Sequence, residues 1–202
     1  MATLADLPLG ATILIPVGTE ENRLCEVADK NNLVSGGTVL VYKSIYENST
    51  FGNSSLYPDG TLDNLIKNTI YNSFPQAVRE KMLNVTFALE GSGSITRKMF
   101  ALTYTMVGFG DNNGTTEGKA LQYYTSNASR QRITSFGWWL SSRNGTSHPR
   151  RVDSGGNAAD YGDPSESYGV VPAFVIPQSV QIDDTPDNDG SYRLTELQSY
   201  CS

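Results

Sequence analysis

The densest group of side chains able to bind or react lies between positions 138 and 168. This stretch combines hydroxyl, amide, guanidinium, imidazole, carboxylate and phenol groups, the composition of adaptable recognition surfaces. The alternative is a set of solvated loops without a partner. We expect recognition, and the candidate ligand-binding residues are Trp139, Arg143, Asn144, His148, Arg150, Arg151, Asp153, Asn157, Asp160, Tyr161 and Tyr168.

Trp138 and Trp139 are adjacent in a run that is typical of a strand. Neighbouring residues of a strand face opposite sides of the sheet. The pattern therefore predicts that one tryptophan enters the core while the other faces outward or lines a pocket. The competing interpretation is that both are packing residues, because a tryptophan buries a large area.

Catalysis finds little support in the residue pattern. His148 is the only histidine, so a metal site built on several histidines is excluded, and no serine lies in a nucleophile elbow. Hydrolysis of a glycan would need two converging carboxylates, and the sequence does not bring Asp153, Asp160, Asp163 or Glu166 together. We predict a protein that is not an enzyme and that uses no cofactor.

Four aspartates near the C-terminus resemble part of a calcium loop, but a complete loop needs further ligands and a distal glutamate. Aspartate-rich turns between strands give the same letters. We therefore predict a turn and no metal site at Asp183, Asp184, Asp187 and Asp189.

Composition narrows the choice of partner. Charged residues make up 18% of the chain, the formal net charge is -6, and glycine and small polar residues are abundant. This balance argues against nucleic acid as the partner, since polyanions bind clustered lysine and arginine. No apolar run approaches the roughly 20 residues that cross a bilayer, so no membrane insertion is expected. We also expect no secretory signal at the N-terminus.

The two cysteines, Cys25 and Cys201, lie near opposite ends of the chain. They either pair across a very long loop or remain free thiols. Lone bridges are rare in domains that fold without them, which favours free thiols. No CxxC spacing occurs, so a thiolate zinc site is not expected.

Hydrophobic periodicity predicts a mixed α+β fold. Strands are expected at 9–17, 23–29 and 38–46, as an antiparallel meander. Apolar spacing of three and four residues predicts a helix from a Thr61 cap to Phe74, and a second helix from Pro75 to Met82. The later predictions are strands at 85–90, 95–102, 137–143, 149–154 and 168–176, short helices at 103–107 and 116–125, and a C-terminal hairpin within 178–202.

Four landmarks occur in one order along the chain: LDNLIKNTIYNSF, RKMFALT, WWLSSR and GVVPAFVIP. Together with the opening MATLADLPLG and the ending QIDDTPDNDGSY, they resemble an uncharacterised domain encoded by phages and prophages of gut Firmicutes. The tryptophan strand followed by a Gly-x-x-Pro-Ala strand also resembles the C-type-lectin-like fold of formylglycine-generating enzymes and phage tropism proteins. Two departures are Val171, where the resembling domains carry arginine, and Ser142-Arg143 in place of their Arg-Ser-Pro.

The resemblance implies one C-type-lectin-like α+β domain over 1–202, with small twisted sheets, two flanking helices and a binding face made of loops. It implies a virion protein that is made in the bacterial cytoplasm, released by lysis and displayed on the particle. The context of Cys25 and Cys201 does not match the cysteine pair of the formylglycine-generating enzymes, which counts against that activity.

Two functions follow as hypotheses. The first is attachment to a glycan or protein of the host surface or of mucus through the 138–168 loops. The second is a structural role in capsid decoration or tail assembly, in which other virion proteins are the partners and 1–16 is the docking segment. Both are compatible with a homo-oligomer.

Overall fold

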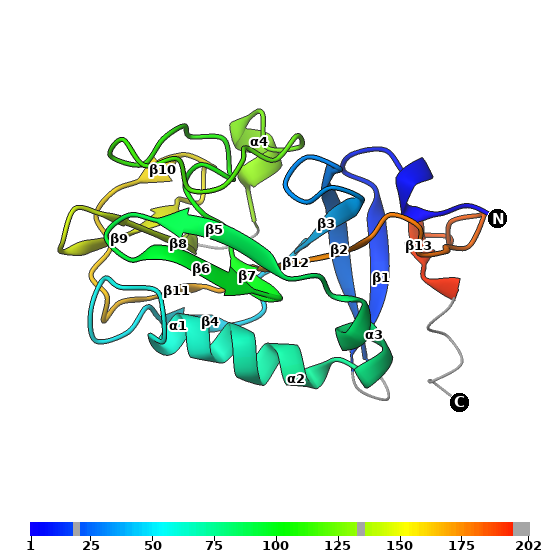
Figure 1. The fold of residues 1–202 in the computed structure, drawn as a ribbon, viewed down its shortest axis with the longest axis horizontal. Helices are drawn as coiled ribbons and strands as arrows, with labels where there is room; N and C mark the ends of the chain where they lie inside the picture. Colours follow the sequence, from blue (N-terminus) through cyan, green and yellow to red (C-terminus); the bar gives the residue numbers. More distant parts are fainter. Residues whose placement is uncertain (18–20, 133–135, 196–202) are drawn as a thin grey trace.

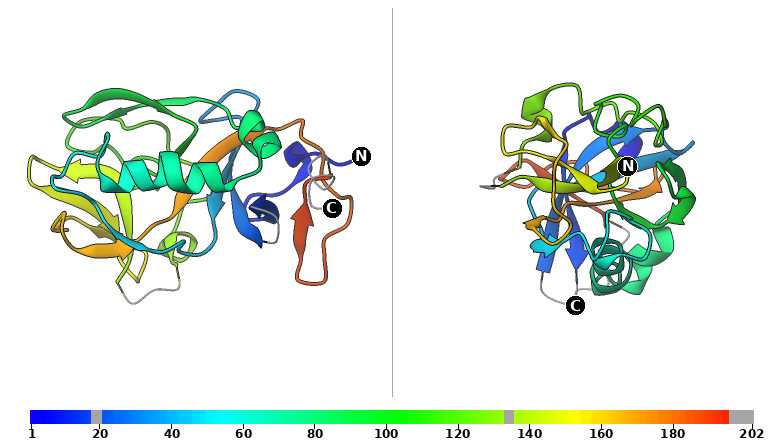
Figure 2. Two further views of the ribbon diagram at one scale, coloured as in Figure 1. Left: turned by 90° about the horizontal axis from the view of Figure 1, so that it is seen from below. Right: turned by 90° about the vertical axis from the view of Figure 1, so that its left-hand side faces the viewer.

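The computed structural model describes residues 1–17, 21–132 and 136–195. Two sheets lie at opposite ends of the long axis, and a helix runs along one side between them (Figures 1 and 2). The architecture is mixed α+β with small sheets and short helices, as the periodicity predicts. Within the described ranges, no helix is long and apolar enough to cross a membrane.

The first sheet has the strand order β13-β1-β2-β3-β12-β7. The predicted meander is confirmed, because β1 pairs with β2 and β2 with β3 in antiparallel register. β12 adds antiparallel to β3, which brings residues from the two ends of the chain together. The strand bounds are β1 Thr12–Val17, β2 Glu21–Lys30, β3 Gly37–Tyr42, β7 Met99–Ala101, β12 Pro172–Pro177 and β13 Ser191–Arg193.

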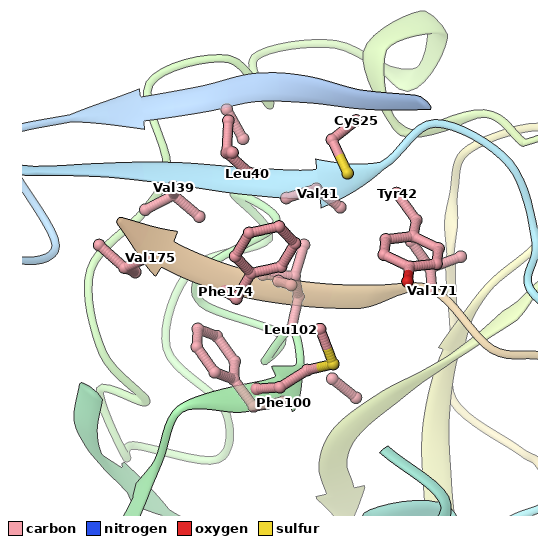
Figure 3. Packing of buried hydrophobic residues seen from close by; sticks show 14 of the residues in the cluster. Cys25, Val39, Leu40, Val41, Tyr42, Phe100, Leu102, Val171, Phe174 and Val175 are labelled. Carbon is pink, nitrogen blue, oxygen red and sulfur yellow. The ribbon is translucent and has the colours of Figure 1, made fainter. Parts of the chain in front are cut away.

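The core of the molecule is centred on the pair β3 and β12. Every residue of β3 is buried, as are all residues of β12 except the last. Phe174 pairs with Leu40 and packs edge-on against Phe74 at 5.6 Å between ring centroids. Figure 3 shows Phe174 among the aliphatic side chains of β3, with Val171 at the start of the strand. Val171 is fully buried, so an apolar side chain suits this position.

The second sheet has the order β10-β9-β8-β11-β4. The strands predicted at 137–143 and 149–154 are confirmed as an antiparallel pair. The run predicted at 168–176 divides instead, with β11 in this sheet and β12 in the other, so Val170 and Val171 join the two sheets. The strand bounds are β4 Asn48–Thr50, β8 Trp138–Asn144, β9 His148–Val152, β10 Ala158–Ala159 and β11 Ser167–Gly169.

The two predicted helices are confirmed. One helix is continuous through α1 (Thr61–Asn64), a wider π-helical segment η2 (Leu65–Ile70) and α2 (Tyr71–Ser73). Gly60 takes the N-cap position predicted for Thr61, which is the first helical residue. Leu62, Ile66 and Ile70 form the buried face, and the following helix is α3 (Gln76–Lys81).

The helices predicted at 103–107 and 116–125 are wrong, since turns and loop occupy these residues. Threonine side chains supply the reason. The hydroxyl of Thr103 donates to the carbonyl of Glu117 at 2.5 Å, and the Glu117 N–H donates to the Thr105 hydroxyl at 3.0 Å. These bonds tie the two segments side by side in a folded loop, which a short helix α4 (Asn127–Arg130) follows.

The strand predicted at 95–102 is split at Lys98. Its first part, β6 (Gly93–Arg97), forms a hairpin with β5 (Val85–Leu89), whereas its second part is β7 of the six-stranded sheet.

Residues 1–16 are part of the fold. A short 3₁₀ turn η1 (Leu4–Asp6) precedes β1, and Leu4 is fully buried. Thr3 forms a β-bridge with Gln181, and β13 lies parallel to β1. The bridge between Ile182 and Leu194 closes a hairpin-like return within the C-terminal segment. Removal of 1–16 would therefore take most of β1 out of the sheet, and the docking role of this segment stays a prediction.

Candidate recognition surface

Both tryptophans of β8 are buried. Trp138 donates its indole N–H to the carbonyl of Arg130 at 3.1 Å, and Trp139 donates to the carbonyl of Ser49 at 2.8 Å. They point to opposite faces of the sheet, as strand geometry requires, but other segments cover each face. The prediction that one tryptophan reaches the surface is therefore wrong for Trp139, which is 0% exposed.

The segments that cover Trp139 create an aromatic layer. Tyr168 meets the indole edge-on at 4.7 Å, and Phe51 does so at 5.4 Å. Gly162 crosses the ring so closely that a Cβ at this position would lie 2.6 Å from it. The Arg151 guanidinium then lies over the Tyr168 ring at 4.4 Å. Trp139 is thus the buried support of a surface that Tyr168 and Arg151 form.

Two strongly exposed rings extend this layer. Tyr161 is 75% exposed and Phe136 is 64% exposed, values that are unusual for large aromatic side chains. His148 contacts the Tyr161 ring edge-on at 5.7 Å, and Arg151 donates to the carbonyl of Phe136 at 3.1 Å. The residues of these contacts lie on or beside β9 and β11, and we call them the recognition strip: Phe136, His148, Arg151, Tyr161 and Tyr168.

Arg150 lies beneath this surface and not on it. Its guanidinium forms an ion pair with Asp160, donates to Asn112 Oδ1 at 2.5 Å and to Asn113 Oδ1 at 3.3 Å, and lies 4.2 Å from the centroid of the Tyr104 ring. The residue is 5% exposed. The predicted ligand role of Arg150 is therefore replaced by a structural one, and Asp160 belongs to the same network.

Glu117 is a second buried polar centre next to Arg150. Its carboxylate accepts hydrogen bonds from the Glu90 N–H at 2.9 Å, from Asn112 Nδ2 at 3.0 Å and from the Ser142 hydroxyl. Burial raises the pKa of Glu117, and these hydrogen bonds oppose the rise. Asn112 also binds Arg150, so it joins the carboxylate to the guanidinium. This arrangement fixes loops and leaves no exposed reactive group.

The remaining predicted residues hold turns at the edges of the sheet. Arg143 donates to the carbonyl of Glu90 at 3.1 Å, and Asn144 accepts a bond of 3.4 Å from Asn113. Burial acts to raise the pKa of Asp153, but hydrogen bonds from Asn157 and from the backbone N–H of Gly155 outweigh it and lower this pKa. These residues do not join the recognition strip.

The C-terminal aspartates behave as the turn prediction expects. Asp189 Oδ1 accepts from the Ser191 N–H at 3.0 Å, Asp187 pairs with Arg193 at 2.7 Å, and Asp184 accepts from the Ala2 N–H at 2.6 Å. Each carboxylate thus has a separate partner. In residues 1–17, 21–132 and 136–195, no group of histidine, cysteine and acidic side chains could hold a metal ion.

Cys25 is fully buried, and burial raises the pKa of its thiol far above the ordinary value. Cys201, its possible partner, lies outside the described residues.

Phe136 was missed by the sequence reasoning. It stands two residues before the tryptophan pair, so the aromatic run FGWW was a usable signal. Asn112, Glu117 and Ser142 were also missed, and they come from segments far apart in the chain. No local spacing in the sequence predicts such a network.

Comparison with known protein families gives a match. Residues 35–178 match the model of a family described as a domain of unknown function, DUF6273. No curated protein and no solved structure matches the chain. The matched range begins just before β3, ends just after β12 and includes the second sheet, both helices and the recognition strip. Because the match covers most of its length, the chain belongs to the DUF6273 family.

Proposed function

We propose that this chain is a non-catalytic binding domain of a bacteriophage particle, and that its recognition strip attaches to a glycan of the host surface or of mucus. The observation that carries the proposal is the exposure of Tyr161 and Phe136. The groups beneath this surface, Trp139 and Tyr168, are held in place by their ring contacts. Large rings with this degree of exposure are uncommon on soluble proteins, and exposed apolar surface often marks a binding site.

The chemistry of the strip suits a sugar. An exposed ring can stack on the apolar C–H face of a pyranose, while guanidinium, imidazole and phenol groups bind its hydroxyls. Arg151 is held over Tyr168, and Tyr168 rests on Trp139. Little side-chain freedom would be lost on binding, because these groups are already ordered.

The finer fold assignment belongs to the same proposal. Small, mainly antiparallel sheets, a flanking helix and a loop-built face are what a C-type-lectin-like domain would have. The landmark motifs shared with phage-encoded proteins support a place on the virion.

A glycan array and a whole-cell binding assay test the proposal with the purified protein. We expect binding to a defined subset of glycans, and we expect Tyr161→Ala combined with Phe136→Ala to weaken it by about tenfold or more, as for central aromatic anchors. The matched control is Tyr192→Ala, a half-buried tyrosine on β13 far from the strip.

Absence of binding on both the array and the cells would overturn the proposal. Binding that the double variant leaves intact would also overturn it, since the partner would then contact another surface. Capture of cells that survives removal of their glycans would assign the strip to a protein receptor instead.

A further inference from the structure

A separate pocket of about 350 Å³ opens on the first sheet, away from the recognition strip. β2 and the end of β3 form one side, and the segment around α4 forms the other. Apolar groups of Leu24, Tyr123 and Ala128 make up part of its wall. The complete lining is Leu24, Glu26, Lys43, Ser44, Tyr123, Ala128, Ser129, Gln131 and Arg132.

The Glu26 carboxylate reaches this pocket although the residue is 4% exposed. Its Oε1 accepts the Tyr124 hydroxyl at 2.7 Å and also pairs with Arg132. Its Oε2 accepts no hydrogen bond from the described part of the chain. It is also not one of the polar atoms that are both fully inaccessible to solvent and without a hydrogen bond. A carboxylate oxygen of a pocket-lining residue, with no donor among the described residues, is suited to accept a hydrogen bond from a ligand.

Arg132 cannot supply that donor, because its own donors are engaged. They bind the backbone carbonyls of Tyr42 at 3.2 Å, Ser129 at 3.3 Å and Gln131 at 2.9 Å, besides Glu26 and the Tyr124 hydroxyl. Arg132 therefore neutralises the charge of Glu26 and fixes the position of its carboxylate.

Lys43 determines the net charge of the pocket. Glu26 and Arg132 cancel, so the ammonium of Lys43 leaves a net positive charge on the pocket. Its Nζ contacts the Thr12 hydroxyl at 3.1 Å and is exposed. A ligand for this pocket thus needs a hydroxyl donor for Glu26, an anionic group for Lys43, and an apolar face for Leu24 and Tyr123.

We propose that this pocket binds a monosaccharide-sized acidic polyol, a uronic acid in chemical class. One ring hydroxyl donates to Glu26 Oε2, the carboxylate pairs with Lys43, and the C–H face of the ring lies on Tyr123 and Leu24. The site shares no residue with the recognition strip, so it would stand if the strip had another function.

An NMR titration of the ¹⁵N-labelled chain tests this proposal with three probes. D-Glucuronate carries both the hydroxyls and the carboxylate, D-glucose lacks the carboxylate, and acetate lacks the ring. We expect D-glucuronate to shift amides of the pocket saturably with a dissociation constant of about 1 mM, typical of a small polar ligand. D-Glucose and acetate should each bind about tenfold more weakly or not at all.

Three variants identify the groups. Glu26→Gln keeps an oxygen that can accept from Tyr124 and Arg132 but replaces Oε2 by an amide donor. It should therefore lower the affinity for D-glucuronate about tenfold. Lys43→Gln should reduce the affinity for D-glucuronate to that for D-glucose. Ala128→Trp fills the pocket from an exposed position that the fold tolerates and should abolish binding, whereas its control, Ala128→Ser, should not.

The proposal is overturned if D-glucuronate causes no saturable shifts in the pocket at concentrations about tenfold above the expected constant. It is also overturned if Ala128→Trp, with native spectra elsewhere, binds as the parent does. Equal affinity for D-glucose and D-glucuronate would refute the role of Lys43 and with it the acidic class.

Discussion

The centre of the six-stranded sheet and the loops around the five-stranded sheet are stabilised by different kinds of contact, although a buried ion pair of Arg132 with Glu26 also lies against β2 of the first sheet. The six-stranded sheet is centred on β3 and β12, whose interior residues are apolar apart from Thr38. The five-stranded sheet and its loops depend on buried guanidinium groups: Arg150 joins Asp160 to Asn112, and Arg130 donates to the backbone carbonyls of Val107 and Tyr124.

This difference has an energetic meaning. Apolar burial is non-directional and tolerates small shifts, whereas a buried guanidinium needs its partners in fixed places. A surface that must hold aromatic groups in one geometry gains from the second kind of support. The comparison predicts that the two regions respond differently to substitution.

The largest effect is expected in the apolar region. Phe174→Ala removes a fully buried ring that packs on Phe74 and should lower the free energy of unfolding by about 3–5 kcal/mol. Urea titration followed by circular dichroism measures it. Phe136→Ala is the matched control, since that ring is 64% exposed and its loss should change stability by about 0.5 kcal/mol or less. Similar costs for the two variants would contradict the position of the core.

The next effect concerns the polar region. Arg150→Met leaves Asn112 and Asp160 without their donor and should cost about 2 kcal/mol, less than a fully buried ion pair because the Asp160 side chain is 42% exposed. Arg150→Lys should recover only part of this, because a lysine cannot reproduce the forked hydrogen bonds. Full rescue by lysine would mean that charge alone matters there, and the contrast between the sheets would weaken.

A smaller effect depends on pH. Burial raises the pKa of Glu117 above its ordinary value of 4.5, so the folded state binds more protons than the unfolded state just above that value. The contribution of Glu117 to the stability of the parent protein should therefore fall as pH rises through this window. Glu117→Gln removes the group, and its stability relative to the parent should increase from about pH 4 to pH 7. A difference that is flat or falls with pH, measured by urea titration, would contradict the buried state of Glu117.

The smallest effect is expected at the exposed pair of Arg193 and Asp187. Both side chains are 41% exposed, so Arg193→Ala should cost about 0.5 kcal/mol or less. Thermal unfolding at low and high salt measures it. A cost comparable to that of Arg150→Met would show that exposure does not separate the two arginines.

The same contrast explains what the sequence could predict. β1, β2, β3 and the helix over 61–73 follow from periodicity, because their apolar residues repeat at the spacing of the element. The same reasoning gave a wrong prediction for the folded loop at 103–118. There, Thr103 and Thr105 form hydrogen bonds with the backbone of Glu117, which is distant in sequence. In the candidate site, some residues could be predicted from the sequence and others could not. His148, Arg151, Tyr161 and Tyr168 were identified from residue type, but which arginine is buried depends on partners such as Asn112 that no local pattern reveals.

The passage from β11 to β12 has a mechanical consequence. Only Val170 and Val171 separate a strand of one sheet from a strand of the other, and both are buried. We expect such a short, packed connection to couple the motion of the two sheets. Force applied at the five-stranded sheet would therefore pass through two buried residues into β12, one of the most apolar strands of the molecule.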